Sequence, residues 1–372
     1  MSGRIKMTDL VGGFGWIHRG RETLVARLLR HAAGSAEPLA LDPADAPARA
    51  FRWLIDGGLG PLLWHAARAT STPISAERHA ELRGADLTAR FHHANLVDTA
   101  CDVIDAGAAT GVPVILLKGI SVSEELYPAE HLRPMGDIDV LIPRGGYARL
   151  EAELLSANYE RLPYPEIAGH HHGAPLRHRT RGTLVELHVE LFPDDSPLRR
   201  PGGALSAEAV TEDGTQPSRY HGRPVLRLSP ARQLLYIAAS WFNDLTLRPP
   251  HPSFLASLFD AVYLTTLHHE LLADEVALSP VDNPIARGSL LALLTYLPRF
   301  GLQAPSARRM RALRTGPAAV GPFELRLIHA MLDRYQIGGR RWNFALPPPV
   351  PGRYNVRNQL HTKLRFPASG QM

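Results

Sequence analysis

The sequence predicts an α+β fold in which a small mixed sheet lies between two helical regions. Apolar residues recur at helical spacing before residue 112, short branched or alternating apolar runs follow up to residue 230, and helical spacing then returns. On this basis we expect four segments: an N-terminal helical region over 1–111, an α/β core over 112–230, a C-terminal helical region over 231–344 and a Pro-rich basic tail over 345–372.

The composition is that of a globular protein and excludes several classes. Of the 372 residues, 45% are hydrophobic and 21% are charged, which argues against disorder. No run of about 18 apolar residues occurs, so we expect no membrane span and no membrane partner. The first 20 residues lack the apolar run of a signal peptide, and we expect a cytoplasmic protein. Cys101 is the only cysteine, which excludes an internal disulfide and a Cys-based zinc site, and we expect no disulfide-linked partner. The net charge of +5 permits a polyanionic partner such as a nucleotide or RNA.

The N-terminal region predicts helices that glycines separate. Residues 24–34 place apolar side chains at helical spacing, and residues 50–69 predict a helix, a glycine break and a second helix. Residues 76–111 predict a long Ala-rich helix that ends at Gly111, with Pro113 preventing its continuation.

The core begins with a short strand and a short helix. Residues 113–119 form an apolar run that stops at Gly119, as expected for a buried strand entering a turn. Residues 121–128 predict a helix in which Ser121 is the N-cap and Glu124 completes a capping box.

The rest of the core predicts further strands and one helix. A strand is expected over 137–143, an amphipathic helix over 145–160 and a strand of period two over 183–192. Residues 193–219 are expected to form a low-complexity insertion or mobile loop, and residues 220–230 a tight turn leading to a short strand.

A clear helix start opens the C-terminal region. Ser229 is expected as N-cap and Pro230 at the first helical position. The pattern is helical from 231 to about 337, and the tail over 345–372 is expected to be loosely ordered.

Two aspartates begin the strand predicted over 137–143. Asp137 and Asp139 are two residues apart, so their carboxylates leave the same face of the strand. Such a pair repels unless a cation joins it, and Mg²⁺ is a hard ion that takes oxygen ligands. Glu186 lies on a later strand and shares a face with His188, and it can reach the same site if the two strands are neighbours. The alternative is a solvent-facing stripe on an edge strand.

The segment before these acids can bind phosphate. Backbone N–H groups at a turn and helix start bind phosphate, which we expect at Gly119 and Ser121, and Lys118 or Arg133 can add positive charge. Lys118 can instead form an ion pair with an acid of the site. A phosphate cradle with three carboxylates meets the needs of metal-assisted nucleotidyl transfer.

Three segments together resemble the signature of a known family. LLKGISVSEELYP, LRPMGDIDVLI and VELHVEL are similar to motifs of the uncharacterised nucleotidyltransferase family of the polymerase-β-like superfamily. The resemblance extends over roughly residues 20–335. It implies an α+β nucleotidyltransferase core, metal ligands at Asp137 and Asp139, and a third acid at Glu186 that binds metal or acts as base.

The resemblance also implies the reactants. It implies Mg²⁺ (or Mn²⁺) and a nucleoside triphosphate whose NMP moves to a hydroxyl or phosphate acceptor, which is a small molecule, a peptide or an RNA. Lys118, Gly119 and Ser121 would hold the phosphates. The turn reads Lys-Gly-Ile-Ser where the superfamily has adjacent Gly-Ser, which favours an alternative: a catalytically inactive nucleotide- or partner-binding module with the same fold.

The histidine- and arginine-rich segment over 170–182 has two interpretations. It is a solvated loop, or Arg177 and Arg181 gather a triphosphate or polyanionic acceptor beside Glu186. His188 either supports the metal-bound carboxylates or is a simple strand-face residue. A further hypothesis is a metallohydrolase that uses the three histidines 170–172. The histidines 92, 93, 221, 268 and 269 are expected at the surface, and Cys101 in the core.

Overall fold

The structure is a computed structural model of the chain. It describes residues 23–41, 48–164, 170–246, 253–272 and 283–314, except 195 and 197, together with residues 325, 326 and 329. The first 20 residues and the tail predicted over 345–372 lie outside the described residues.

The N-terminal region consists of helices, as its spacing predicts. They are α2 (Leu24–Ala32), α3 (Ala48–Asp56), α4 (Gly60–Ala69) and α5 (Ala76–Thr110). The Ser75 side chain caps α5 by accepting a hydrogen bond from the backbone N–H of Arg78. Gly111 ends α5 in the left-handed conformation with φ of 67°, which confirms the predicted helix end.

A seven-stranded mixed sheet forms the centre and confirms the α+β fold. The spatial order of the strands is β3-β4-β5-β2-β1-β7-β6. β2 runs parallel to β5 and β1 parallel to β7, whereas the other neighbours are antiparallel. The strands are β1 (Ile115–Leu116), β2 (Asp137–Leu141), β3 (Tyr159–Arg161), β4 (Leu176–His178), β5 (Leu184–His188), β6 (Thr215–Tyr220) and β7 (Arg223–Leu228).

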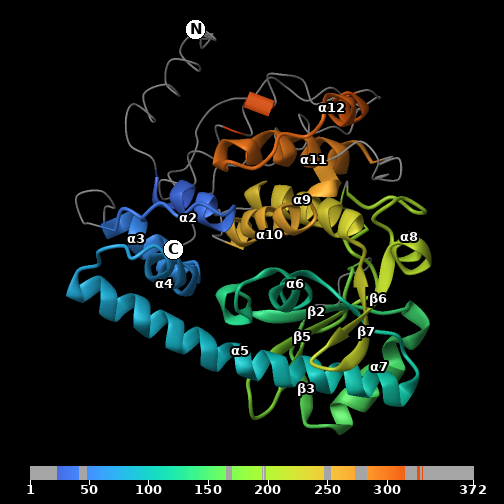
Figure 1. The fold of residues 1–372 in the computed structure, drawn as a ribbon. Helices are drawn as coiled ribbons and strands as arrows, with labels where there is room; N and C mark the ends of the chain where they lie inside the picture. The colour runs from blue at the N-terminus through green and yellow to red at the C-terminus, as the bar shows by residue number, and fades with distance from the viewer. Residues whose placement is uncertain are drawn as a thin grey trace, which may run out of the picture.

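Short helices connect the strands. They are α6 (Lys118–Leu126), the 3₁₀ turns η1 (Glu130–Leu132) and η2 (Arg144–Gly146), α7 (Tyr147–Ser156) and α8 (Ala207–Asp213). In Figure 1 the long helix α5 passes along the sheet and continues to α4.

The period-two pattern of the central strands separates their two faces. Ile138 and Val140 of β2 and Val185 of β5 are fully buried in one cluster with residues of α5 and α7 such as Val103 and Leu150. The acidic residues of β2 and β5 alternate with these apolar ones and therefore lie on the opposite face. The apolar alternation thus fixes the face that carries the candidate site.

The C-terminal region is also helical where it is described. Its elements are α9 (Pro230–Thr246), α10 (Ser253–Leu267), η3 (His269–Leu272), α11 (Pro284–Tyr296), η4 (Leu297–Phe300) and α12 (Ala307–Arg314). Pro230 opens α9, as predicted. Leu28 of α2, Leu62 of α4 and Phe259 of α10 belong to one buried cluster, so the N- and C-terminal helices share a core (Figure 1).

Two sequence predictions in the core are wrong. The segment 193–219, expected as an insertion or mobile loop, contains α8 and β6. β6 pairs with β7 over its whole length, and a tight turn at His221 and Gly222, with φ of 44° and 81°, joins the two strands. This turn and the strand after it agree with the prediction for residues 220–230. The helix predicted from Ser121 starts earlier, at Lys118, and Ser121 lies inside it without capping it.

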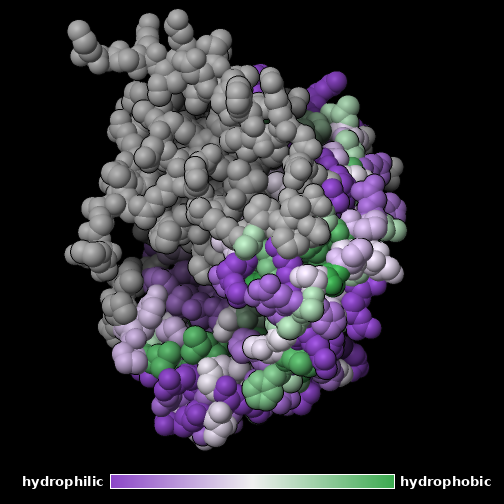
Figure 2. Space-filling model, turned by 90° about the vertical axis from the view of Figure 1, so that its left-hand side faces the viewer, coloured by the Kyte–Doolittle hydropathy of each residue, from purple (hydrophilic) through white to green (hydrophobic). Residues whose placement is uncertain are grey.

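Two further features concern the hydrophobicity of the helices and of the surface. Among the described residues, no helix is long and apolar enough to cross a bilayer. On the face in Figure 2 the coloured surface is mostly hydrophilic, with hydrophobic residues in small separate patches.

Candidate active site

The pairing of β2 with β5 brings two carboxylates side by side. Asp139 is the register partner of Glu186, and His188 pairs with Leu141 two positions further along. Ligand atoms of Asp139, Glu186 and His188 all lie within 4.8 Å of one another. Asp137 is the first residue of β2 and lies on the same face. The strands therefore gather three carboxylates and an imidazole on one face of the sheet.

Asp139 is the most enclosed of these acids and has two basic partners. It is 4% exposed; His188 Nε2 lies 2.7 Å from Oδ1, and Lys118 Nζ lies 3.2 Å from Oδ2. Burial acts to raise the pKa of Asp139, but the Lys118 charge and the His188 hydrogen bond outweigh it and hold the pKa below its usual range. Asp139 is therefore a carboxylate throughout the neutral range.

Lys118 reaches this acid because the start of α6 is fixed against β2. The backbone N–H of Leu117 donates to the carbonyl of Asp139 at 3.0 Å. Lys118 has φ of 45°, a conformation that few non-glycine residues adopt. Burial acts to lower the pKa of Lys118, but the Asp139 charge raises it, so the side chain stays an ammonium. Lys118 therefore forms an ion pair with an acid of the site, which is one of the two expectations for it.

Asp137 has the opposite electrostatics. Burial and the neighbouring Asp139 charge raise the pKa of Asp137 to about 6. Two acids of one strand face thus repel each other, and a cation bound between them would relieve this repulsion. The oxygen donors and the unbalanced charge fit a hard divalent ion.

Glu186 has histidine neighbours on two sides. Its Oε2 lies 3.5 Å from His188 Nε2 and 3.4 Å from His172 Nε2. Burial acts to raise the pKa of Glu186, but the His188 hydrogen bond lowers it below its usual value. His172, which the sequence assigned to a loop, bridges to His188 and lies beside the acids. Only its position shortly before the VELH strand could have indicated this.

The residues expected at a phosphate turn are arranged differently. Arg133 donates to both oxygens of Asp260, at 3.1 and 2.7 Å, instead of facing the acids. A Cβ added to Gly119 would lie 2.9 Å from Arg133 Nη1 and 3.0 Å from Met135 Cβ, so a larger residue there would require these side chains to shift. Ser121 is buried in α6, and its carbonyl accepts a hydrogen bond from Arg227. Of the four residues expected to bind phosphate, Lys118 is the one that contacts an acid of the site, Asp139.

The two arginines of the basic segment have acidic partners of their own. Arg177 pairs with Glu160 across β3 and β4. Arg181 donates to Asp102 of α5 at 2.6 Å. These ion pairs hold the edge of the sheet and the end of the segment in place.

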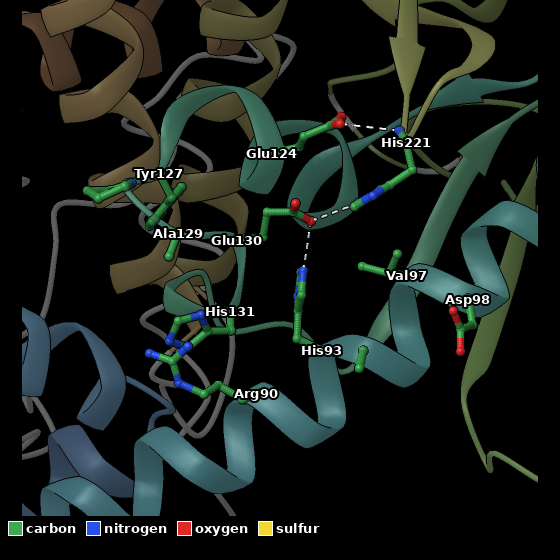
Figure 3. Close-up of a pocket in the computed structure, with 12 residues that line it drawn as sticks. Arg90, His93, Val97, Asp98, Glu124, Tyr127, Ala129, Glu130, His131 and His221 are labelled. Carbon is green, nitrogen blue, oxygen red and sulfur yellow. Dashed lines mark hydrogen bonds and ion pairs between the residues drawn. The ribbon is translucent and has the colours of Figure 1, made fainter.

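A separate pocket lies between α5, the end of α6 and the β6–β7 turn. It has a volume of about 620 Å³, and none of the three acids lines it. Figure 3 shows His93 and His221 pointing at Glu130, whose Oε2 lies 3.0 and 3.1 Å from their Nε2 atoms. His93 is therefore buried, which corrects its predicted surface position, whereas His221 is exposed. Cys101 is buried as expected, and burial raises its pKa, so it stays an unreactive thiol.

Comparison with known families gives one match. A family model described as "Uncharacterised nucleotidyltransferase" matches residues 43–280, more than half of the chain. No curated protein sequence matches the chain.

Two solved structures are similar. One is the antibiotic-resistance factor ANT(2'')-Ia, with 15% identity, a TM-score of 0.32 and coverage of 47% of this chain and 85% of that one. The other is an antigenic nucleotidyltransferase-like protein from Paracoccidioides brasiliensis, with 16% identity, a TM-score of 0.36 and coverage of 57% and 95%.

Proposed function

The chain belongs to the uncharacterised nucleotidyltransferase family, and we propose that it moves a nucleoside monophosphate from a nucleoside triphosphate to a hydroxyl or phosphate acceptor with the help of Mg²⁺. The acceptor is a small molecule, a peptide or an RNA. One observation carries the proposal: Asp139 and Glu186 are register partners on neighbouring parallel strands, with Asp137 on the same face.

The three acids would hold the metal. Carboxylate oxygens are the ligands that Mg²⁺ or Mn²⁺ takes, and the pKa of Asp137, raised to about 6 by burial and by Asp139, reflects negative charge that a cation would offset. When bound, the metal supplies polarisation of the α-phosphate and offsets the charge on the leaving pyrophosphate.

The other side chains support binding and proton transfer. Lys118 carries its charge to the acids and is 38% exposed, so its ammonium group can contact a phosphate oxygen. His188 is fully enclosed and orients Asp139 through the 2.7 Å hydrogen bond. Glu186 is partly exposed, and its lowered pKa keeps it ionised, so it can accept the proton of the attacking hydroxyl.

Pyrophosphate release from each of the four NTPs tests the proposal, with pools of small molecules, peptides and RNA as acceptors. We expect release that a chelator abolishes and that Mg²⁺ restores. Glu186→Gln should reduce the rate by about 10²–10⁴-fold, the scale of a lost general base. Glu212→Gln is the matched control, because Glu212 is exposed on α8 and should leave the rate unchanged. Chelator-resistant transfer, or full activity of Glu186→Gln, would refute the proposed roles.

A nucleotide- or partner-binding module without transferase activity is the second candidate. The buried Ser121 and the Arg133–Asp260 pair favour it, because both depart from an open phosphate turn. Nucleotide binding without transfer to any acceptor pool would select this candidate.

A further inference from the structure

We propose that His170, His171 and His172 form a second metal site, which takes a divalent transition metal of the zinc class and lies beside the three acids. The site goes beyond the proposed transfer reaction, because its nitrogen ligands belong to a different segment of the chain and have a different metal preference.

The first observation is convergence. Each of the three histidines offers one ring nitrogen, and these nitrogens lie within 4.8 Å of one another. The ring centroids are 4.3 to 4.7 Å apart. Consecutive residues of an extended chain normally point to opposite faces. Three adjacent imidazoles that converge therefore need a bend, and the segment has one at His171.

The fold holds this bend in place. The carbonyl of His171 accepts hydrogen bonds from the backbone N–H groups of Val189 and Glu190, at 2.8 and 3.2 Å. His172 forms an antiparallel bridge with His188. The three rings are thus anchored to the end of β5, and their arrangement depends on the folded sheet.

The second observation is the direction of the ring nitrogens. His172 Nδ1 lies 2.7 Å from the carbonyl oxygen of Gly173, and His170 Nδ1 lies 3.2 Å from that of His172. A carbonyl oxygen can only accept, so both Nδ1 atoms carry the proton and both Nε2 atoms have a lone pair. The lone pair of His170 Nε2 accepts a hydrogen bond from the Tyr164 hydroxyl at 3.1 Å, and a bound metal would replace this hydrogen bond. A histidine that binds a metal commonly donates its other N–H to a carbonyl in this way. His171 Nδ1 is buried and has no hydrogen-bond partner among the described residues.

The ligand chemistry selects the metal. Imidazole nitrogen suits Zn²⁺, Co²⁺ and related ions, whereas Mg²⁺ prefers oxygen. Three protein nitrogens leave the fourth tetrahedral position to another ligand. Glu186 Oε2 lies 3.4 Å from His172 Nε2, close to the roughly 3.3 Å between ligand atoms of a tetrahedral site with bonds of about 2.0–2.1 Å. Glu186 thus connects the histidine site to the acids.

Co²⁺ binding to the full-length, tag-free protein, first stripped with a chelator, tests the proposal. We expect one equivalent to bind with the visible absorption of nitrogen-ligated four-coordinate Co²⁺, and Zn²⁺ to displace it. His172→Ala and, separately, His170→Ala should each weaken binding by about 100-fold or more, beyond the loss that outer partners of a ligand cause. His269→Ala is the matched control, because His269 is 81% exposed on η3 and should leave binding unchanged.

Three results would overturn the site: unchanged Co²⁺ affinity in both histidine variants, no binding to the native protein, or equally tight binding by a peptide of residues 170–182, since the site requires the fold. Circular dichroism of the metal-free variants shows that they remain folded. Asp137→Asn should bind Co²⁺ normally even if nucleotidyl transfer is never observed, so failure of the proposed function and failure of this site are distinguishable.

Discussion

Replacing Asp260 by alanine is expected to cost about 3–5 kcal/mol of folding free energy. Asp260 is 2% exposed on α10 and accepts hydrogen bonds from Arg133 Nε and Nη2, at 3.1 and 2.7 Å, and from the Tyr127 hydroxyl at 2.7 Å. The alanine variant leaves the Arg133 guanidinium, 11% exposed, without its counter-charge. The penalty is the cost of a buried and uncompensated charge.

Urea unfolding followed by tryptophan fluorescence measures this effect. The midpoint should fall with little change in the slope of free energy against urea. Asp105→Ala is the comparison, because the Asp105–Arg223 pair is exposed and should contribute little to the free energy of unfolding. A loss below about 1 kcal/mol for Asp260→Ala would contradict this expectation, because it would mean that Arg133 finds other partners.

The remaining stability predictions concern a buried acid and two glycines. Burial acts to raise the pKa of Asp86, but hydrogen bonds from Arg90 and His131 outweigh it and lower the pKa below the ordinary value of 3.8. The stabilisation that the ionised Asp86 provides is therefore complete above pH 3.8 and is lost as the pH falls through the lower pKa of the folded state. Asp86→Asn should therefore cost about 1.5–3 kcal/mol in urea unfolding at pH 7 and less at pH 3, and an equal cost at both would disprove the linkage. Gly119→Ala should destabilise the protein by about 1–3 kcal/mol because the added Cβ would contact Arg133. Gly84→Ala should instead stabilise it by about 0.5–1 kcal/mol, because there is open space around Gly84 in α5. Thermal melts in which the two substitutions shift the midpoint in the same direction would rule this out.

Elements with a strong local signal were predictable from the sequence. The 35 residues of α5 have an N-cap and a C-terminal glycine, and Pro230 opens α9 at the predicted position. The spacing of Asp137 and Asp139 placed both on one strand face, and the structure has β2 there. Each of these signals involves only a few neighbouring residues, so it can be recognised without knowledge of the tertiary contacts.

Features that depend on long-range pairing were not predictable. β3 and β4 have three residues each, too few for a period-two pattern, and are stabilised by pairing with neighbouring strands. The start of α6 at Lys118 depends on the hydrogen bond from Leu117 to Asp139 of β2, which overrides the capping signal of Ser121. Likewise, the approach of His172 to Glu186 follows from the bridge to His188, 16 residues away in the chain.

The rate of nucleotidyl transfer by Asp139→Asn, measured at nucleotide and Mg²⁺ concentrations that saturate the native enzyme, tests the catalytic role of the paired strands most directly. Asp56→Asn, an exposed aspartate on α3, is the control. We expect this saturated rate, kcat, to fall by at least about 10²-fold in Asp139→Asn, the scale of one lost electrostatic group, while the control keeps the native value. Transfer by Asp139→Asn within a factor of about two of the native rate would show that the β2–β5 acids are not the catalytic site.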